Sequence, residues 1–275
     1  MKILNKENFL ENSFKGIRSY ETQSEERDYP YYSTQNEPFF SLLIDIKGTK
    51  TLDQALDNYV KYEILDKDDK DEKKDNRIIS EKYKRKIKAK RNCSLKKLGN
   101  FVIIRLKRYD FVQKDNGQIY ERKIDDYFTF PKEINFKRWT RAYLHSKDSN
   151  NNEEMEIYDE EKRNLEDNYV DYVLTGVSIS QGKISQGHYY SFIMDQKSRD
   201  WYKFDDEKVE KFDIENEKKK EFENDCFGDY EYNKSAYLLF YTKKSLLKQE
   251  GTIQNINNNN EEVLQNIKKK KMSFI

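Results

Sequence analysis

One of the two histidines in the chain, His188, stands a short distance before a double aspartate, Asp205 and Asp206. The stretch that joins them, residues 185–212, reads SQGHYYSFIMDQKSRDWYKFDDEKVEKF. An imidazole held by a carboxylate is the general-base half of a nucleophilic triad, because the carboxylate fixes the tautomer and stabilises the imidazolium that forms when the base takes a proton. The same pair also occurs as an ordinary structural hydrogen bond, so spacing alone leaves both interpretations open.

A β-hairpin would bring these residues together. The strand-like runs HYYSFIM and WYKFDD flank a polar loop at 195–200, and symmetric pairing about that loop places Tyr190 opposite Asp205. Because side chains alternate along a strand, Asp205 then shares a sheet face with His188, one diagonal step away, and Asp206 points to the other face. A register slip of one residue would exchange the two aspartates.

The elements around this hairpin follow from periodicity. Apolar residues at every second position predict a strand over 40–46, and a change of period predicts a helix over 52–60, with Thr51 and Gln54 as its capping box. The run FVIIRLKRYDF predicts another strand, and Asn-Gly at 116–117 predicts a turn. Four strand-like runs follow in quick succession: DYVLTGVSIS, HYYSFIM, WYKFDD and SAYLLFY. The close spacing of these runs along the chain predicts an antiparallel sheet.

Charged segments interrupt these elements. Residues 66–91 are almost all charged or polar, which predicts a solvated excursion or a charged surface helix. Residues 146–168 are acidic and rich in asparagine, as in a mobile insertion, and the Asn/Lys-rich residues 243–275 predict a disordered tail. With a leader of uncertain structure at 1–13, we expect one domain at 14–242 with polar insertions at about 66–91 and 146–168.

Composition restricts the class of protein. Charged residues make up 37% of the chain and apolar residues 35%, while 14% are aromatic, which indicates a real core with long polar insertions. The 52 basic side chains nearly balance the 51 acidic ones, so we expect no nucleic-acid partner. The sequence has no long apolar run or secretory leader, so we expect no membrane partner. Two cysteines cannot form a disulfide framework, which favours the cytoplasm or nucleus.

The segment GVSISQGKISQGHYYSFI, followed by WYKFDDEKV and SAYLLFY, resembles the histidine box of the ubiquitin-specific proteases, the large cysteine-protease family of deubiquitinases. Further blocks match in the family's order: FKG, EPFFSLLIDIKG, TLDQALDNYVKYEIL, KLGNFVIIRLKRYDF, KIDDYFTFP and NDCFGDY. The resemblance covers roughly residues 14–242. It implies an α+β, papain-like fold with palm and fingers antiparallel sheets, and with the cysteine-bearing thumb missing.

The resemblance also implies roles for individual residues. His188 matches the catalytic base, Asp205 the residue that orients it, and Asp206 a second acidic residue that supports the site in some members. Gly187 would border the narrow channel that holds the C-terminal diglycine of ubiquitin, where only a small residue leaves backbone room. Tyr189 and Tyr190 would supply walls of that channel.

The sequence departs from the family in its cysteines. Nothing in it corresponds to the family's cysteine box, which supplies the nucleophile. Basic neighbours of Cys93 could lower its pKa, but we expect both Cys93 and Cys226 to be packed, inert thiols. The usual four-ligand zinc site of the fingers cannot form, so we expect no metal and no cofactor, with FFSLLIDI and its neighbours holding the fingers. The second histidine, His145, is expected at the surface.

The resulting hypothesis is thiol-dependent hydrolysis of the bond after the C-terminal glycine of ubiquitin, with this chain supplying the His/Asp half of the site. Its partners would be ubiquitin and ubiquitinated proteins. The main alternative is a catalytically inactive ubiquitin-binding or scaffold relative. A hydrolase that uses Cys93, or an interaction protein acting through the KKKK cluster at 268–271, ranks lower. A missing thumb would leave apolar surface exposed, so we expect the isolated chain to self-associate.

Overall fold

The alternating apolar runs near the C-terminus build the central sheet of the protein, which we call the palm sheet. The computed structural model describes residues 11, 13–68, 75–114, 116–147, 159–166, 168–183, 186–228 and 233–247. The strand order is β15 (Lys208–Lys211), β14 (Trp201–Asp205), β13 (Gln186–Met194), β12 (Asp171–Lys183), β16 (Lys234–Lys243), β8 (Phe101–Lys107) and β3 (Leu42–Asp45), and β11 (Glu133–Asn135) also pairs with β12. All pairs are antiparallel except β3 with β8. The antiparallel sheet predicted from the last four runs is therefore confirmed.

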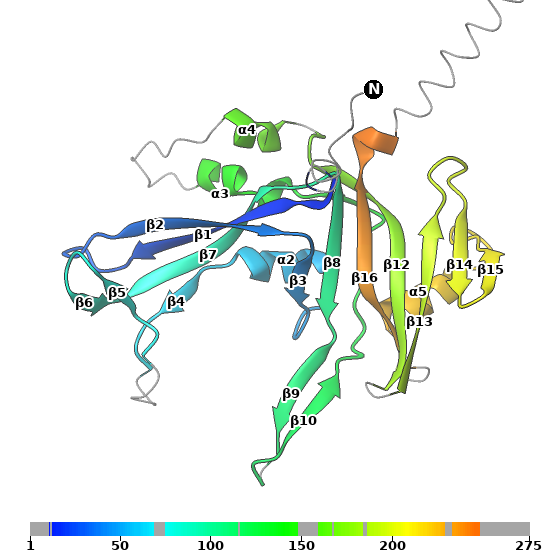
Figure 1. The fold of residues 1–275 in the computed structure, drawn as a ribbon, viewed down its shortest axis with the longest axis horizontal. Coiled ribbons are helices and arrows are strands. Elements are labelled where there is room, and N and C mark those ends of the chain that lie inside the picture. Colours follow the sequence, from blue (N-terminus) through cyan, green and yellow to red (C-terminus); the bar gives the residue numbers. More distant parts are fainter. Residues whose placement is uncertain are drawn as a thin grey trace, which may run out of the picture.

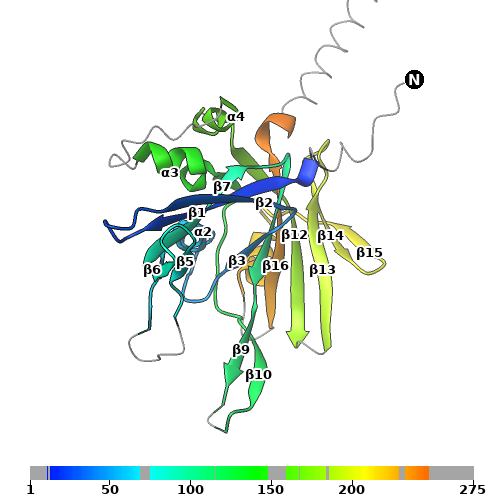
Figure 2. The ribbon, with the colours of Figure 1, turned by 60° about the vertical axis from the view of Figure 1, so that its left-hand side comes forward.

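A second sheet, the fingers sheet, extends to one side of the palm (Figures 1 and 2). Its order is β2 (Tyr32–Phe39), β1 (Gly16–Ser24), β7 (Ala89–Lys97) and β4 (Glu63–Leu65). A short hairpin of β5 (Ile78–Ser80) and β6 (Arg85–Ile87) lies at its far end. Another hairpin, β9 (Tyr109–Gln113) and β10 (Ile119–Lys123), turns at the predicted Asn-Gly, where Gly117 has φ +82°, and extends beyond the palm sheet.

Helices cover one face of the palm sheet. Helix α2 (Leu52–Val60) begins at Thr51, whose side chain accepts a hydrogen bond from the backbone N–H of Gln54, as predicted. Helix α5 (Lys219–Phe227) packs against β16 and β12. The remaining short helices are η1 (Lys137–Trp139), α3 (Arg141–Lys147), α4 (Asp159–Lys162) and η2 (Arg163–Leu165), near the base of the fingers. No helix in the described ranges is long and apolar enough to cross a membrane.

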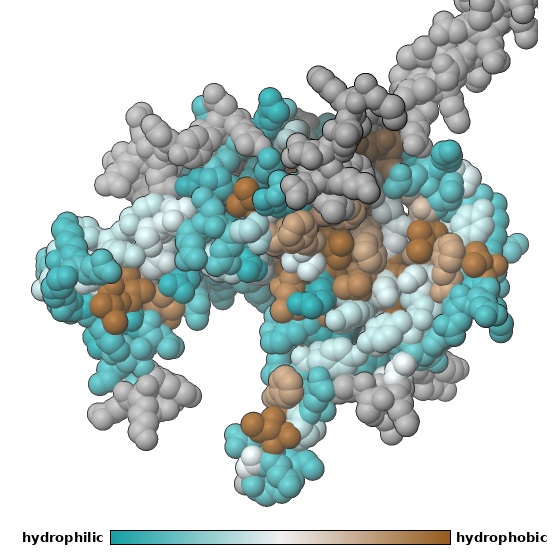
Figure 3. All heavy atoms as spheres, in the orientation of Figure 1, coloured by the Kyte–Doolittle hydropathy of each residue, from teal (hydrophilic) through white to brown (hydrophobic). Residues whose placement is uncertain are grey.

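The two faces of the palm sheet differ in what covers them. On the helical face, Ile104, Leu239 and Phe192 are completely buried, and Phe222 of α5 packs edge-on against Phe192. On the opposite face, apolar side chains surround an open hollow of about 350 Å³. Figure 3 shows these apolar residues at the centre of the visible surface. The hollow is lined by Phe14, Phe101, Ile103, Ile193, Leu238 and Phe240, among others.

The charged segment 66–91 contains regular strands. Among its described residues, β5, β6 and the start of β7 are strands and not a helix, and β7 lies inside the fingers sheet between β1 and β4. The strand expected at 40–46 is confirmed as β3, but it begins only at Leu42, because the chain bends at 40–41 between the end of β2 in the fingers and the start of β3 in the palm. The segment FFSLLIDI therefore contributes mainly to the palm sheet and does not hold the fingers together.

The acidic segment 146–168 contains a packed element. Residues 148–158 and the KKKK cluster lie outside the described residues, but Glu161 in α4 is buried and accepts a hydrogen bond from Arg141 at 2.9 Å. Arg141 also donates to Glu21 of β1 at 2.9 Å, and His145 contacts the other oxygen of Glu21 at 2.7 Å. The expected surface position of His145 is wrong, because its side chain is only 15% exposed. This ionic cluster joins α3 and α4 to the fingers.

Candidate active site

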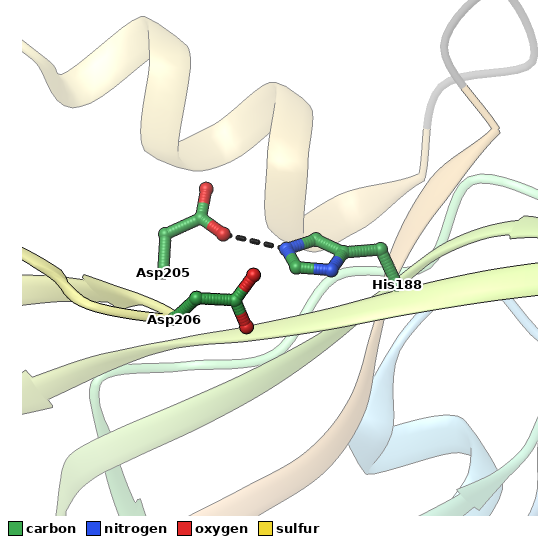
Figure 4. Close-up of side chains that lie close together, drawn as sticks. All are labelled: His188, Asp205 and Asp206. Atoms are coloured by element: carbon green, nitrogen blue, oxygen red, sulfur yellow. Dashed lines mark hydrogen bonds and ion pairs between the residues drawn. The ribbon is translucent and has the colours of Figure 1, made fainter.

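The hairpin β13–β14 has the register expected from its symmetric loop. Ser191 pairs with Phe204 and Met194 with Trp201. This pairing continues toward Asp205, so His188 and Asp205 fall on the same face as diagonal neighbours. The Nε2 atom of His188 lies 2.5 Å from Oδ1 of Asp205 (Figure 4). The sheet therefore brings together the two residues that the sequence singled out.

The tautomer of His188 follows from this contact. A carboxylate only accepts, so Nε2 must donate its proton to Asp205, and Nδ1 then carries the lone pair in the neutral ring. Among the described residues, none forms a hydrogen bond to Nδ1. The two side chains are 42% and 37% exposed, which leaves the basic nitrogen accessible to a reacting group.

Asp206 does not point to the opposite face, as strict alternation predicted. It begins the turn between β14 and β15, where its φ of 52° takes it out of the extended conformation. A backbone in the left-handed region turns the side chain back, and aspartate tolerates that region better than most residues. One carboxylate oxygen of Asp206 thus lies within 4.8 Å of both the His188 ring nitrogen and an oxygen of Asp205. Three such ligand atoms could face a cation, but both carboxylates and the imidazole are open to solvent.

The residues that flank His188 point in different directions. Gly187 pairs with Gly182 of β12 and is exposed. Tyr189 is 52% exposed, and its ring lies 6.1 Å from that of Tyr237, which in turn lies 6.3 Å from Tyr109. These three rings form a partly exposed aromatic surface. The sequence argument found it only in part, because Tyr109 and Tyr237 come from strands distant in the chain.

Tyr190 lies on the helical face, buried beneath His188. Only 4% of it is exposed, and its ring stacks on the imidazole with centroids 6.2 Å apart and an interplanar angle of 26°. Its hydroxyl donates to Asp225 of α5 at 2.6 Å. Burial, and then the carboxylate of Asp225, raise the pKa of the Tyr190 hydroxyl. Of the two tyrosines expected to line a channel, Tyr189 is therefore the accessible one.

Comparison with known proteins places this geometry in a family. The family model described as "Ubiquitin carboxyl-terminal hydrolase" matches residues 3–241. The chain belongs to the ubiquitin carboxyl-terminal hydrolase family. The deubiquitinase family that the histidine box resembles is thus confirmed, and so is its papain-like, ubiquitin-specific protease type of fold.

Individual relatives are similar at moderate identity. The chain is 30% identical to mouse Ubiquitin carboxyl-terminal hydrolase 24 over 252 residues, which cover 86% of the chain and 9% of that protein. It is 29% identical to Ubiquitin C-terminal hydrolase 13 of Arabidopsis thaliana, covering 78% of the chain and 18% of that protein. A solved SAGA DUB module bound to ubiquitin aldehyde has a similar fold, with a TM-score of 0.58, 24% identity, and coverage of 85% of this chain and 42% of that chain. The chain thus spans a small part of the length of its curated relatives.

Two buried cations hold the strand ends around the family's histidine box. Lys123, 7% exposed, donates to the carbonyl oxygens of Gly182 at 3.2 Å and Asn233 at 2.9 Å, and pairs with Asp125 at 2.9 Å. Arg108 is completely buried and donates to the carbonyl oxygen of Ala236 at 3.1 Å, among others. Each cation satisfies carbonyls where strands end, and Lys123 thereby ties the β9–β10 hairpin to the loop that precedes His188.

Neither thiol of the chain is suited to be the family's nucleophile. Cys93 is buried in β7 within 3.4 Å of the Tyr59 hydroxyl, and Cys226 is buried in α5. Burial raises the pKa of the Cys93 thiol and raises that of Cys226 well above its ordinary value. The possible lowering of the Cys93 pKa by basic neighbours is therefore wrong, and so is the hydrolase that would use Cys93, because a buried protonated thiol is a poor nucleophile.

An aromatic and ionic cluster occupies the end of the fingers, where many family members bind zinc. The chain's two cysteines lie in other places and its two histidines are His145 and His188, so these residues do not fit a four-ligand zinc site. Instead Tyr29 and Tyr83 pack edge to face with centroids 5.2 Å apart. The Arg85 guanidinium lies 4.2 Å from the Tyr29 centroid and pairs with Glu26 at 3.3 Å.

Proposed function

We propose that this chain supplies the general base and the substrate-binding surfaces of a deubiquitinase that hydrolyses the bond after the C-terminal glycine of ubiquitin. The observation that carries the proposal is the 2.5 Å contact between His188 Nε2 and Asp205 Oδ1, in a chain of this family, with Nδ1 left accessible. It is the arrangement that a thiol nucleophile requires of its base.

The chemistry of His188 follows from that geometry. Nδ1 takes the proton of a cysteine thiol, and the thiolate attacks the carbonyl carbon of the terminal glycine. The imidazolium, stabilised by Asp205, then gives its proton to the leaving amine as the carbon–nitrogen bond breaks. In the second half, Nδ1 takes a proton from water, the resulting hydroxide displaces the thiolate from the thioester, and the imidazolium returns the proton to the thiolate. Because Cys93 and Cys226 are buried, the nucleophile must come from a cysteine outside this sequence.

The shape of the molecule supports a protein substrate. The fingers sheet and the β9–β10 hairpin project from the palm in different directions, and Figure 3 shows an open concavity between them. The exposed ring of Tyr189 and the half-buried rings of Tyr109 and Tyr237 lie where that hairpin meets the palm. An extended ubiquitin tail passing these rings would reach His188 through the exposed Gly187, which offers no side chain to block it. The similarly folded DUB module solved with ubiquitin aldehyde supports ubiquitin as the ligand.

The buried thiols favour a second candidate function for the chain acting alone. A ubiquitin-binding protein without hydrolytic activity needs the palm, fingers and aromatic surface, but it needs no nucleophile. The two candidates share one binding surface and differ only in whether a reactive cysteine acts together with His188.

One experiment separates them. The endogenous polypeptide is isolated with an antibody against residues 185–212, its size is measured, and it is treated with ubiquitin whose C-terminus carries a thiol-reactive electrophile. Covalent labelling that is lost in a His188→Gln variant supports the hydrolase. Binding of 15N-labelled ubiquitin without labelling supports the binding protein. Absence of both would overturn the proposed function.

A further inference from the structure

The buried Tyr190 ring lies beside the exposed His188 imidazole and nearly parallel to it, with ring centroids 6.2 Å apart. His188 and Tyr190 are two residues apart on β13, so their side chains leave the same face of the strand. The Tyr190 ring packs edge-on against Phe192 as well, with centroids 5.8 Å apart, and this fixes it from below. The partly exposed imidazole thus has as its neighbour a ring that is itself held by the core.

The far end of Tyr190 is anchored by a buried carboxylate. Asp225 is 4% exposed, and its two oxygens have separate partners: Oδ2 accepts the Tyr190 hydroxyl, and Oδ1 accepts the Lys234 ammonium at 3.0 Å. Lys203 lies 4.0 Å from Oδ2, and its ammonium is 4.7 Å from the Tyr190 centroid. A buried carboxylate is costly unless it is paired, so this set of partners holds Asp225 and the phenol in one geometry.

We propose that Tyr190 and Asp225 are positioning residues that hold the His188 imidazole in its reactive orientation. The inference rests on the proposed function. The hydrogen bond to Asp205 fixes one ring atom, but χ2 of histidine is a soft torsion and the ring can still rock about that contact. A flat ring behind it removes this motion and keeps Nδ1 directed outward.

NMR of this chain labelled with 13C-histidine tests the positioning directly. The chain has two histidines, and His145, held by Glu21 near the base of the fingers, reports whether the fold is intact. Tyr190→Phe removes only the hydroxyl, and Asp225→Asn keeps an acceptor but removes the charge. The matched control is Tyr241→Phe, which removes a buried hydroxyl that donates to the carbonyl oxygen of Pro131 at 2.7 Å in the same sheet.

The expected result is a change in the ring signals of His188, with broadening from ring motion, in both test variants and not in the control, while His145 stays unchanged in all three. Signals of His188 that superimpose on those of the unaltered chain in both Tyr190→Phe and Asp225→Asn would overturn the proposal. If Tyr190→Phe also changes the signals of His145, this variant has lost the fold. The result for Asp225→Asn then decides whether the proposal stands.

An activity measurement on the complete native polypeptide separates this proposal from the function on which it rests. Both test variants should lower kcat by roughly 10- to 100-fold with little change in KM, as expected for a misplaced reacting group. If His188→Gln loses hydrolysis but both test variants keep full kcat, only the positioning role is contradicted and the proposed function stands. Full hydrolysis in His188→Gln contradicts the proposed function itself.

Discussion

His188 and Asp205 are diagonal neighbours across the β13–β14 hairpin, and their contact at 2.5 Å joins an exposed imidazole to the last residue of β14. The register of the hairpin, and not the sequence distance between the two residues, sets this contact. The pairing of Ser191 with Phe204 beside it therefore fixes the backbone that carries both side chains. A site built on sheet strands in this way holds its geometry better than one built on loops.

The first prediction concerns the two members of that pair. His188→Gln removes the base and should lower hydrolysis by the native polypeptide about 10²- to 10⁴-fold. Asp205→Asn should be similarly severe, because an amide that donates to Nε2 would favour the wrong tautomer, an effect worth about 10⁴-fold in serine proteases. Steady-state kinetics on a ubiquitin C-terminal amide measure both. Ubiquitin affinity should stay the same, and a loss of affinity equal to the loss of rate would point to a binding role instead.

The parts of this site that could be predicted are those that depend on local regularity. Symmetry about the loop at 195–200 was sufficient to place Asp205 beside His188, because strand alternation has a fixed period. Alternation failed at Asp206, where the strand ends in a turn with positive φ. Asp225 gave no local signal, because its contact with Tyr190 joins a helix to a strand 35 residues away.

The fingers could not be predicted for a related reason. Residues 78–97 are rich in lysine and arginine, so their alternation is hidden by side chains whose charged ends reach solvent while their stems lie along the sheet. Their strand β7 is stabilised by β1, about 70 residues away in the chain, and not by a neighbouring hairpin. The partly buried position of His145 likewise depends on Glu21, 124 residues away.

A second prediction follows from the buried thiols. Cys93 and Cys226 should react with a thiol reagent only slowly in the native chain at neutral pH, because burial raises the pKa of both thiols and also excludes the reagent. Both should react fully once the chain is unfolded in denaturant. A Cys93→Ser variant should label with the electrophilic ubiquitin to the same extent as the unaltered polypeptide. Rapid reaction of one equivalent of thiol in the native chain would contradict the buried assignment.

A third prediction concerns the ionic cluster around Glu21. Burial raises the pKa of Glu21, but the hydrogen bonds from His145 and Tyr32 outweigh it, so the net pKa lies below its ordinary value. A carboxyl group whose pKa is lower in the folded state stabilises the fold at pH values above its unfolded-state pKa of about 4.3. This stabilisation is lost as the pH falls through the folded-state pKa. Glu21→Gln should therefore lower the free energy of unfolding by about 3 kcal/mol or more at pH 7. The difference in this free energy between the variant and the unaltered chain should shrink below about pH 4.

Denaturant unfolding across pH measures this difference. Glu37→Gln is the control, because Glu37 pairs with Arg18 at 3.0 Å but is 36% exposed, and such a pair contributes about 1 kcal/mol or less. If Glu21→Gln and Glu37→Gln lower the free energy of unfolding equally at pH 7, burial of the Glu21 cluster adds nothing to the stability of the fold.

A fourth prediction concerns the end of the fingers. Because Tyr29, Tyr83 and Arg85 pack where a metal would otherwise be needed, chelators should leave the unfolding midpoint unchanged. Tyr83→Ala removes the aromatic pair, worth about 0.5–1.5 kcal/mol, and should speed amide exchange in β5 and β6 by up to about tenfold without affecting the palm. Hydrogen exchange followed by mass spectrometry resolves the two regions. A midpoint that falls on chelation would mean that a metal holds this end.

The fifth prediction concerns the apolar face of the palm sheet that no described helix covers. Large uncovered apolar surfaces seek partners, so the chain alone should self-associate at micromolar concentration. Ile193, 43% exposed at this hollow, is the residue to change, and Ile193→Asp should shift the mass measured by light scattering toward that of the monomer. Ile79→Asp is the control, because Ile79 is 70% exposed but lies in the separate β5–β6 hairpin. If both variants reduce self-association equally, general hydrophobicity drives the association and not this face of the palm sheet. If the unaltered chain is already a monomer, the exposed apolar face does not cause self-association and the prediction is wrong.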